Sequence, residues 1–426
     1  MIPDTSATVV HRSNCRLCRS PNVEMVVKLA PIPLAEKYAA TAAGGDGDRL
    51  FPIDLYMCRD CGHVQCLDVI DSDVLWDDYT YHSGQTKGIV DHFEEVAAKI
   101  AAADKPASGS LVIDVGSNDG SLLRPFKSRG HKVLGIDPAK EIARKATESG
   151  IETIPALMTV GLAERIREKY GPASVITAFN VFAHADDMGG MADSIRAMLA
   201  PDGVFVFEVQ YLMDILDKML LGTIFHEHMS HHSFKPLVRF LAAHGLEMID
   251  VERVSIQKGS IIGTAQLKGG PRSAKASVRE LLDLEASRGL DDPQTVRQFG
   301  ERLKRLRDQA QELIALWKRQ GATVAGYGAA RSGPTLIAQL GLGKAISYIL
   351  DDHPQKIYKY SPGDRLQVLP TEELYKRKPD YVVILAWIHA KKIIEKNKKY
   401  LDEGGRFVVL CPEVRVIGAG SAVPVL

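Results

Sequence analysis

The chain has 426 residues, more than one hydrophobic core usually serves, which predicts about two or three domains. Lysine plus arginine and aspartate plus glutamate each number 53, so the formal net charge at neutral pH is zero. That balance excludes the diffuse positive field of proteins that bind nucleic acids or anionic membranes. No segment approaches the roughly 20 apolar residues of a membrane helix and no signal pattern opens the chain, so we expect a cytoplasmic protein.

Four of the six cysteines form two CxxC pairs, Cys15 with Cys18 and Cys58 with Cys61. In a reducing compartment, paired CxxC turns are typical of zinc sites rather than of a disulfide framework. Two such turns supply four thiolates to one tetrahedral ion, which then has no open position for catalysis. The sequence therefore predicts a structural Zn²⁺ site. His63 is interpreted as a polar residue of the second turn, with replacement of one thiolate by its imidazole as the alternative.

After a helical stretch at 91–103, the apolar run 111–115 is typical of a strand, and it leads into the turn Gly116-Ser-Asn-Asp-Gly120. Glycines at this point allow a tight turn and let the backbone approach a bound nucleoside before the next helix begins. The next expected strand, 132–137, ends in Asp137, about 20 residues on, where a carboxylate can accept hydrogen bonds from ribose hydroxyls. The pattern predicts a Rossmann-like half with a nucleoside ligand.

Further strands are expected at 174–179 and 203–209, and each follows a helical pattern. Strands that alternate with helices predict a parallel sheet. Ligands of such sheets bind beyond the carboxyl ends of the strands, which is where Asn180, His184 and Glu208 are expected to lie. Position alone makes these three residues site candidates.

The segment Phe225-His-Glu-His-Met-Ser-His-His232 is dense in side chains that transfer protons. Imidazole suits general-base work because its ordinary pKa lies near the working pH. We expect the neighbouring Glu227 carboxylate to keep His228 basic. The alternative is a metal site formed by His226, His231 and His232, but no matching carboxylate motif on a helix accompanies them.

The C-terminal third has the same pattern as the first Rossmann-like half: a strand, a glycine turn and a second strand that ends in carboxylates. Residues 275–319 carry the charge pattern of a solvated helix face, which predicts a helical connector between the two Rossmann-like regions. An expected strand at 323–328 runs into a glycine turn, and a second at 345–352 closes with carboxylates. Arg331 and Lys356 supply local positive charge, so we expect this region to hold the diphosphate of a nucleotide. The alternative is a Rossmann domain that only packs against the first.

Together these motifs resemble the nucleotide-sugar C-methyltransferase family, S-adenosylmethionine-dependent enzymes that methylate C3 of 4-keto-deoxysugars. The resemblance covers nearly the whole chain. Besides the double CxxC module, it rests on residues 115–123, Asn180-Val-Phe-Ala-His184, Glu208-Val-Gln-Tyr-Leu212, His226-Glu-His228, Gly326-Tyr-Gly-Ala-Ala330, Leu350-Asp-Asp-His-Pro354 and Ile384-Leu-Ala-Trp387.

The resemblance implies an α/β chain in four parts. These are an N-terminal zinc-binding module (1–75), a central Rossmann-like class I methyltransferase domain (76–270), a helical connector (271–319) and a C-terminal Rossmann-like domain (320–426). It also implies S-adenosylmethionine and structural Zn²⁺ as cofactors and a dTDP- or GDP-linked 4-keto-6-deoxy sugar as substrate. We expect a monomer with no nucleic-acid or membrane partner.

The resemblance further implies a role for individual residues. His228 would remove the C3 proton to form an enolate. The other catalytic candidates are Tyr79, Asn180, His184 and Glu227. Contacts to the methyl donor are expected from Gly116, Asn118, Asp119, Gly120 and Asp137. Substrate contacts are expected from Tyr81, Glu208, Phe225, Lys258, Tyr327, Arg331, Asp352 and Lys356.

The chain departs from the family pattern near the expected sugar pocket. Phe225 stands where many relatives carry tyrosine, and the segments 231–233, 257–262 and 331–334 also differ. These departures leave the sugar and the nucleobase open. Three other functions also stay open: methyl transfer to oxygen or nitrogen of a sugar, sugar isomerisation with a vestigial donor site, and a non-catalytic zinc-bearing nucleotide sensor.

Overall fold

The computed structural model describes residues 9–43, 48–71, 74–75, 83–85 and 87–420. The chain divides into two compact units, each built from separate segments. The first takes in residues 1–24, 56–214 and 229–293, and the second takes in 25–55, 215–228 and 294–426. The CxxC pairs and the Gly116–Gly120 turn therefore belong to the first unit, and the His-Glu-His segment belongs to the second. The four contiguous domain ranges stay predictions.

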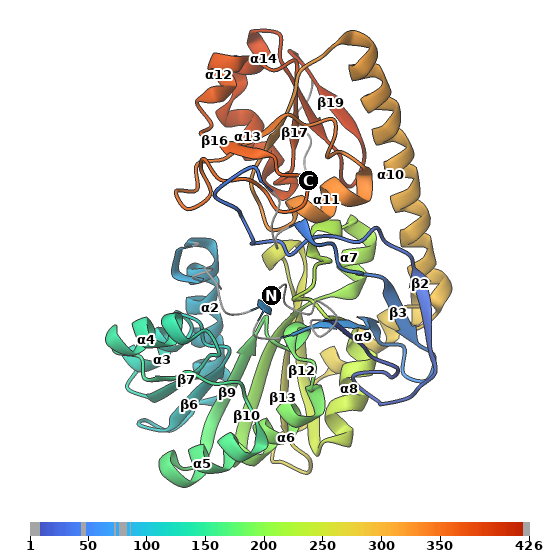
Figure 1. Ribbon diagram of the computed structural model, residues 1–426. Helices are drawn as coiled ribbons and strands as arrows, with labels where there is room; N and C mark the ends of the chain where they lie inside the picture. The colour runs from blue at the N-terminus through green and yellow to red at the C-terminus, as the bar shows by residue number, and fades with distance from the viewer. Residues whose placement is uncertain (1–8, 44–47, 72–73, 76–82, 86, 421–426) are drawn as a thin grey trace, which may run out of the picture. The chain divides into compact units, whose positions relative to one another are not determined.

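A seven-stranded sheet of order β12-β13-β10-β9-β6-β7-β8 forms the centre of the first unit (Figure 1). Its strands are β6 (Leu111–Val115), β7 (Lys132–Ile136), β8 (Thr153–Ile154), β9 (Ala173–Phe179), β10 (Leu199–Gln210), β12 (Leu246–Val254) and β13 (Ser260–Leu267). The five strands from β10 to β8 are parallel, as the sequence predicts. The hairpin of β12 and β13 adds two antiparallel strands that the sequence reading did not predict.

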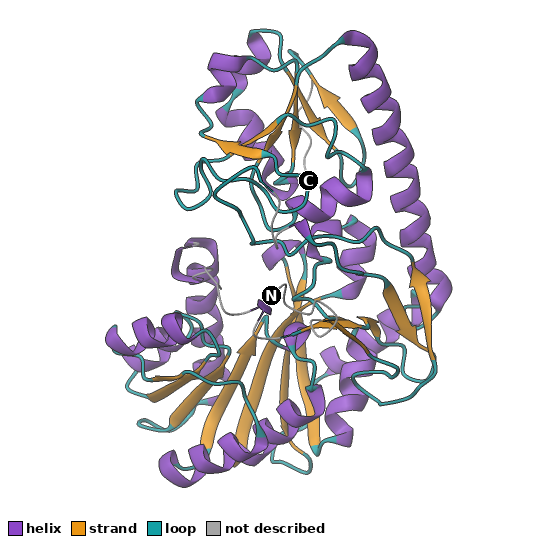
Figure 2. Cartoon of the chain, in the orientation of Figure 1, coloured by secondary structure: helices purple, strands orange, loops and turns teal. Residues whose placement is uncertain are grey.

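Helices lie against this sheet (Figure 2). They are α2 (Lys87–Asp104), α3 (Leu123–Ser128), α4 (Lys140–Glu148), α5 (Val160–Tyr170), α6 (Met188–Met198), α8 (Phe234–Ala243) and α9 (Ala276–Ser287), and α7 (Leu212–Lys218) begins in this unit. Ile89, Phe93 and Ile100 recur on α2 at helical spacing and form one buried cluster with Val112 of β6 and Val206 of β10. This packing fixes α2 on the sheet.

The N-terminal part of the chain forms small sheets, whose strands β2 and β3 extend across the bounds between the two units. A four-stranded sheet has the order β11-β4-β3-β2, and a separate two-stranded ladder pairs β1 with β5. The strands are β1 (Val9–His11), β2 (Val23–Val27), β3 (Leu55–Cys58), β4 (Val64–Cys66), β5 (Asp68–Ile70) and β11 (Ser230–His231). β11 comes from far along the chain and pairs antiparallel with β4.

The second unit contains a six-stranded sheet of order β16-β15-β14-β17-β18-β19, parallel except for its last strand. Its strands are β14 (Val324–Tyr327), β15 (Tyr348–Leu350), β16 (Gln367–Leu369), β17 (Tyr381–Ile384), β18 (Arg406–Val409) and β19 (Arg415–Ile417). Its helices are α10 (Pro293–Gln320), α11 (Gly333–Leu340), α12 (Glu373–Arg377), α13 (Ala390–Lys396) and α14 (Lys398–Asp402). The two strands predicted at 323–328 and 345–352 are confirmed as β14 and β15.

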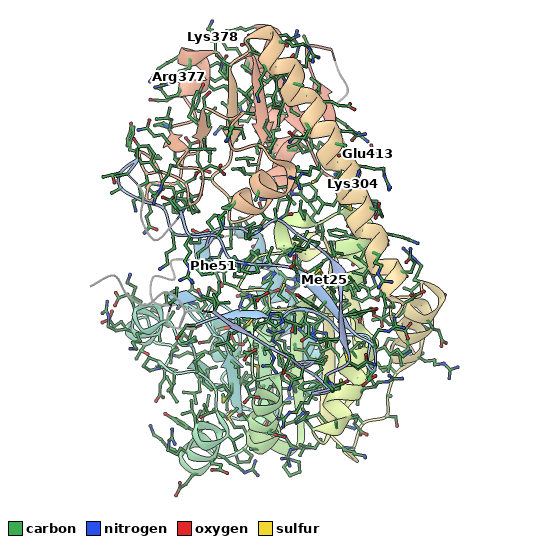
Figure 3. The ribbon with its side chains drawn as sticks, turned by 45° about the vertical axis from the view of Figure 1, so that its right-hand side comes forward. Met25, Phe51, Lys304, Arg377, Lys378 and Glu413 are labelled. Atoms are coloured by element: carbon green, nitrogen blue, oxygen red, sulfur yellow. The ribbon has the colours of Figure 1, made fainter. Side chains whose placement is uncertain are left out.

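The long helix α10 bears out the predicted solvated face. Its buried side chains include Leu303, Ala310 and Ile314, which recur at helical spacing. Lys304, labelled in Figure 3, is exposed and pairs with Asp308 one turn further on, at 2.9 Å. None of the helices in the described ranges combines the length and the apolar character needed to cross a bilayer.

Candidate functional site

The turn after β6 is tight because glycine occupies both of its corners. Gly116 and Gly120 have φ angles of +73° and +77°, in the left-handed region that side chains disfavour. A Cβ atom at Gly116 would lie 2.3 Å from Val181, and one at Gly120 would lie 2.8 Å from Ile151. The turn therefore has no room for side chains at these positions, so its backbone can lie close to a ligand.

Asp137 follows β7 directly and closes the same turn. Its Oδ2 accepts a hydrogen bond from the backbone N–H of Asn118 at 2.8 Å, and its Oδ1 accepts one from Ala139 at 2.9 Å. Burial raises the pKa of this carboxyl group. A carboxylate has about four lone-pair sites, so each oxygen keeps one for a ribose hydroxyl. The residues present thus fit the nucleoside part of S-adenosylmethionine.

The side chains of Asn118 and Asp119 hold the segment that leads into α2. Asn118 Oδ1 accepts from the backbone N–H of Ser83 at 3.0 Å, and Asp119 Oδ2 accepts from that of Gly84 at 2.8 Å. These two predicted donor-binding residues therefore also fix η3 (Ser83–Gln85) over the turn. The predicted site residues Tyr79 and Tyr81 lie outside the described residues.

The carboxyl ends of β9 and β10 bring three predicted residues to one edge of the sheet. Asn180 directly follows β9 and donates its amide N–H to the buried carboxylate of Glu208 at 3.0 Å. Lys258 lies in the turn before β13, and the register of Gln210 opposite Ser260 places that turn at the same edge. His92 on α2, which the sequence reading missed, pairs with Glu208 at 2.5 Å. Only the folded chain reveals this partner.

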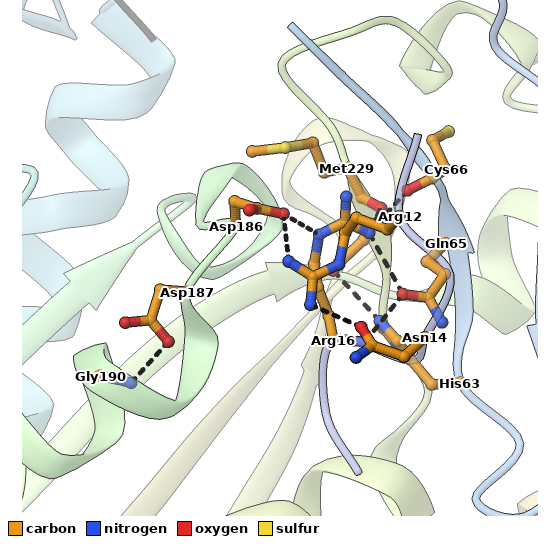
Figure 4. Close-up of polar contacts among 11 residues, drawn as sticks. Arg12, Asn14, Arg16, His63, Gln65, Cys66, Asp186, Asp187, Gly190 and Met229 are labelled. Carbon is orange, nitrogen blue, oxygen red and sulfur yellow. Dashed lines mark hydrogen bonds and ion pairs between the residues drawn. The ribbon is translucent and has the colours of Figure 1, made fainter. Parts of the chain in front are cut away.

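His184 lies in the short helix η4 (Phe182–His184), whose following loop is fixed by arginines (Figure 4). Asp186 accepts from Arg12 Nη1 at 2.9 Å and from Arg16 Nε at 3.0 Å. Arg16 lies between the first two cysteines, is fully buried at its side chain, and also donates to the carbonyl of Cys66 at 2.6 Å. The first CxxC turn is thus tied to the loop that follows His184.

The four CxxC thiols fit one zinc ion. All four sulfur atoms lie within 4.8 Å of one another. The Cys15–Cys61 and Cys18–Cys58 sulfur pairs are 3.6 Å and 3.5 Å apart, close to the edge of about 3.8 Å of a tetrahedron with Zn–S bonds of 2.3 Å. Within the described ranges this is the one group of metal-ligating side chains, so the predicted site is confirmed.

The histidines near the zinc module do not add a second metal site. His63 is fully buried, and its Nε2 lies 3.1 Å from Ser230 Oγ. Its ring stacks on that of His232 at 5.4 Å between centroids. His63 is thus a polar residue at the end of the second CxxC turn and does not join the four thiols, and the β4–β11 pairing buries it. Burial also lowers its pKa.

His228 lies in the second unit, in the irregular segment after η5 (Leu221–Thr223). Its Nδ1 donates to the carbonyl of Thr223 at 2.7 Å, so the lone pair of the neutral ring is on Nε2. The ring of Phe225 packs against it at 4.1 Å between centroids. The pKa of His228 is lowered to about 4, chiefly by burial and to a lesser extent by the charge of Arg331. The expectation that Glu227 keeps this histidine basic is therefore wrong.

Glu227 belongs instead to a charged cluster in the same unit. Arg331 lies 3.6 Å from Glu227 and 3.5 Å from Glu36, and Lys356 lies 3.0 Å from Glu36. Burial raises the pKa of the Glu227 carboxyl, although the charge of Arg331 opposes this shift. The structure thus brings together three of the predicted residues and adds Glu36, which no motif indicated.

The glycine turn after β14 repeats the contact seen at Asp137. Asp351 Oδ2 accepts from the backbone N–H of Ala329 at 2.6 Å, and Gly328 has a φ angle of +100°. The predicted Asp352 instead accepts from Thr371 Oγ1 at 2.7 Å. Tyr327 is buried, and its hydroxyl is 3.4 Å from Asn397. The residue equivalent to Asp137 is therefore Asp351. The sequence alone could not distinguish it from the adjacent Asp352.

Comparisons with known families agree with this architecture. Three family models match the chain: a zinc binding domain over residues 15–76, a methyltransferase domain over 90–251, and a C-methyltransferase C-terminal domain over 255–412. The middle match spans the Gly116–Gly120 turn and Asp137, and the first spans the four cysteines. Each match therefore covers a part of the chain with its own candidate site.

Individual relatives cover different shares of the chain. C-methyltransferase NovU from Streptomyces niveus is 36% identical over 96% of this chain and 97% of its own length. Ubiquinone biosynthesis O-methyltransferase from Rhodopseudomonas palustris is 30% identical over 23% of this chain and 39% of its own length. Among solved structures, magnesium protoporphyrin IX methyltransferase from Synechocystis is 16% identical with a TM-score of 0.33, over 43% of this chain and 80% of that one. The chain belongs to the S-adenosylmethionine-dependent C-methyltransferase family.

Proposed function

We propose that this chain methylates C3 of a nucleotide-linked 4-keto-6-deoxy sugar. The observation that carries the proposal is the state of His228, a neutral imidazole with Nδ1–H fixed on Thr223 and Phe225 packed against its ring. A carbonyl at C4 acidifies the C3 hydrogen because the resulting carbanion is delocalised as an enolate. Nε2 of His228 is the lone pair suited to remove that hydrogen.

The neighbouring charges suit the oxygen on which the enolate charge develops. Arg331 carries a fixed positive charge beside Glu227, whose raised pKa favours its protonated form. A protonated carboxyl group donates a hydrogen bond, and a guanidinium stabilises an oxyanion. S-adenosylmethionine, when bound, supplies an electrophilic methyl group. In this proposal Glu227 and Arg331 stabilise the enolate, and His228 keeps the proton.

We assign the nucleotide part of the substrate to the glycine turn after β14. Asp351 holds this turn as Asp137 holds the donor turn, with lone pairs left for a ribose. Lys356 donates to the carbonyl of Ala329 at 2.9 Å, which places its ammonium beside the turn, where it can pair with a phosphate.

Mass spectrometry of sugar nucleotides tests the proposal. The protein is incubated with S-adenosylmethionine and with dTDP- or GDP-linked 4-keto-6-deoxyhexoses in deuterated water. We expect one sugar to gain a methyl group and to lose the C3 hydrogen. Methyl gain with the C3 hydrogen retained would show transfer to oxygen or nitrogen, and deuterium uptake without methyl gain would show an isomerase. Either result contradicts the proposal.

The matched aspartates of the two turns separate donor binding from nucleotide binding. Asp137→Asn leaves one acceptor for the two backbone N–H groups of Asn118 and Ala139, so the turn loses a hydrogen bond and the ribose loses an acceptor. We expect the Kd for S-adenosylmethionine, measured by titration calorimetry, to rise at least about tenfold. Asp351→Asn is the control and is expected to leave that Kd unchanged. Equal effects of the two variants would remove Asp137 from the donor site.

A further inference from the structure

The carboxylate of Glu208 is engaged at both oxygens inside the first unit. Its side chain is 1% exposed. Oε1 accepts from Asn180 Nδ2 at 3.0 Å, and Oε2 pairs with His92 Nε2 at 2.5 Å. A carboxylate buried to this depth is costly unless hydrogen-bond donors satisfy it. His92 and Asn180 supply those donors, so the three side chains form one unit.

Asn180 has a backbone conformation that needs support. Its φ angle is +58°, in the left-handed region, which is uncommon for residues other than glycine, although asparagine enters it more often than most. The backbone N–H of Asn180 donates to the carbonyl of Glu208 at 2.9 Å, while its amide donates to the carboxylate of the same residue. Glu208 therefore fixes both the backbone and the side chain of Asn180.

This conformation bears directly on the donor turn. Val181, the next residue, is the side chain that a Cβ atom at Gly116 would meet at 2.3 Å. Because Asn180 gives its Nδ2 to Glu208, its Oδ1 is turned away from that carboxylate. β9 neighbours β6 in the sheet, so Asn180 ends beside the turn that begins at Gly116. The carboxyl end of β9, and with it Asn180, thus lies next to the donor turn.

His92 is itself fixed relative to this turn. The adjacent Phe93 packs edge-on against Phe179, the residue before Asn180, with ring centroids 6.0 Å apart. The start of α2 follows η3, which Asn118 and Asp119 hold. The helix that carries His92 is therefore anchored both at the donor turn and at the end of β9.

We propose that His92 is a positioning residue for the methyl donor. Through Glu208 it holds Asn180 so that Oδ1 faces the cationic methionine part of S-adenosylmethionine, whose ammonium donates hydrogen bonds. Removal of the imidazole leaves Oε2 of a buried carboxylate without its donor. The Glu208 side chain then turns, and the left-handed Asn180 relaxes. The donor then loses an oriented acceptor.

Titration calorimetry with S-adenosylmethionine alone tests this role, since it needs no sugar. His92→Leu is expected to raise the Kd for the donor at least about tenfold in folded protein. His92→Gln keeps an amide donor near Glu208 and is expected to restore the Kd to within about threefold of wild type. His131→Leu, which removes a partly buried histidine of the same unit that pairs with Ser110 at 3.3 Å, is the control and should not change the Kd.

Thermal unfolding of the same variants separates positioning from stability. If the His92–Glu208 pair only stabilises the fold, His92→Leu lowers the Tm and leaves the Kd of the folded protein unchanged. That result would overturn the proposal. A leucine variant that binds the donor like wild type, or a glutamine variant that restores nothing, would also overturn it. If His92→Leu does not fold, Asn180→Asp replaces it, because like charges then face each other at Glu208. The same loss of donor affinity is expected, and an unchanged Kd contradicts the proposal.

Discussion

His228→Asn is expected to lower kcat for methyl transfer by at least about a hundredfold, the usual minimum contribution of a positioned general base. Asparagine retains an N–H that can donate to Thr223, as Nδ1 of His228 does, but has no lone pair of comparable basicity. The Kd for S-adenosylmethionine should stay within about twofold, because the proposal assigns donor binding to the Gly116–Gly120 turn and Asp137 and gives His228 only the proton transfer. Single-turnover mass spectrometry and calorimetry measure the two quantities.

His226→Asn is the matched control in the same turn. His226 Nε2 lies 3.4 Å from the carbonyl of Phe51 and its ring packs against Phe51, so its contacts serve the local fold. We expect this variant to retain most of kcat. A His228→Asn enzyme that keeps most of its rate, or a His226→Asn enzyme that loses as much, would show that His228 is not the base.

The lowered pKa of His228 gives the reaction a pH signature. A base acts when deprotonated, so a pKa of about 4 keeps His228 active well below the ordinary histidine range. The acid limb of kcat/KM is therefore expected near pH 4, and a limb near 6.5 would assign the base to a more exposed histidine.

Protein stability should also depend on the protonation of His228, and it should fall as the pH falls. The folded pKa of His228 lies below the unfolded value, so the unfolded chain binds more protons between about pH 4 and 6.5. The contribution to the free energy of unfolding is fully present above about pH 6.5 and is lost as the pH falls towards 4. Its upper size is about 3 kcal/mol. His228→Asn is expected to remove this part of the pH dependence in urea unfolding.

Local sequence chemistry was enough to predict the donor turn. The apolar run 111–115 is bounded by Ser110 and Gly116, and it coincides with β6. Glycine at 116 and 120 is required by φ angles and close contacts that any strand–turn–helix unit of this kind shares. The zinc ligands could also be predicted from the sequence, because two CxxC turns in one chain of a reducing compartment seldom have a role other than metal binding.

The remaining site residues depend on contacts between distant segments. His92 and Glu208 are 116 residues apart, and Glu36 and Lys356 are 320 apart. No periodicity relates such pairs, so only folding reveals them. The choice between Asp351 and Asp352 depends on which carboxylate faces the turn after β14, and a strand turns consecutive side chains to opposite faces. His228 belongs to a different unit from the donor turn because residues 215–228 join the second unit, while the segments before and after them belong to the first. A division of the sequence into contiguous domains cannot predict this.

Loss of zinc is expected to lower the stability of the N-terminal part of the first unit without a direct change in the chemistry of the folded protein. Cys58→Ser removes one of four thiolates from a site whose strands β3 and β4 have only four and three residues. Structural zinc contributes directly to folding free energy, and sheets this short have little stability of their own. We expect Tm to fall by at least about 10 °C in scanning calorimetry, with less than one zinc ion per chain by metal analysis.

Cys66→Ser provides the matched control for this loss. Cys66 is buried in the same small sheet, but its sulfur lies 3.9 Å from His231 Nε2 and is not one of the four thiols of the cluster. This variant should keep its zinc and most of its Tm. The folded fraction of Cys58→Ser, assayed well below its Tm, should methylate at close to the wild-type kcat, because a site with four sulfurs leaves the ion no open position. A Cys58→Ser protein with wild-type Tm and no turnover would instead make the metal catalytic.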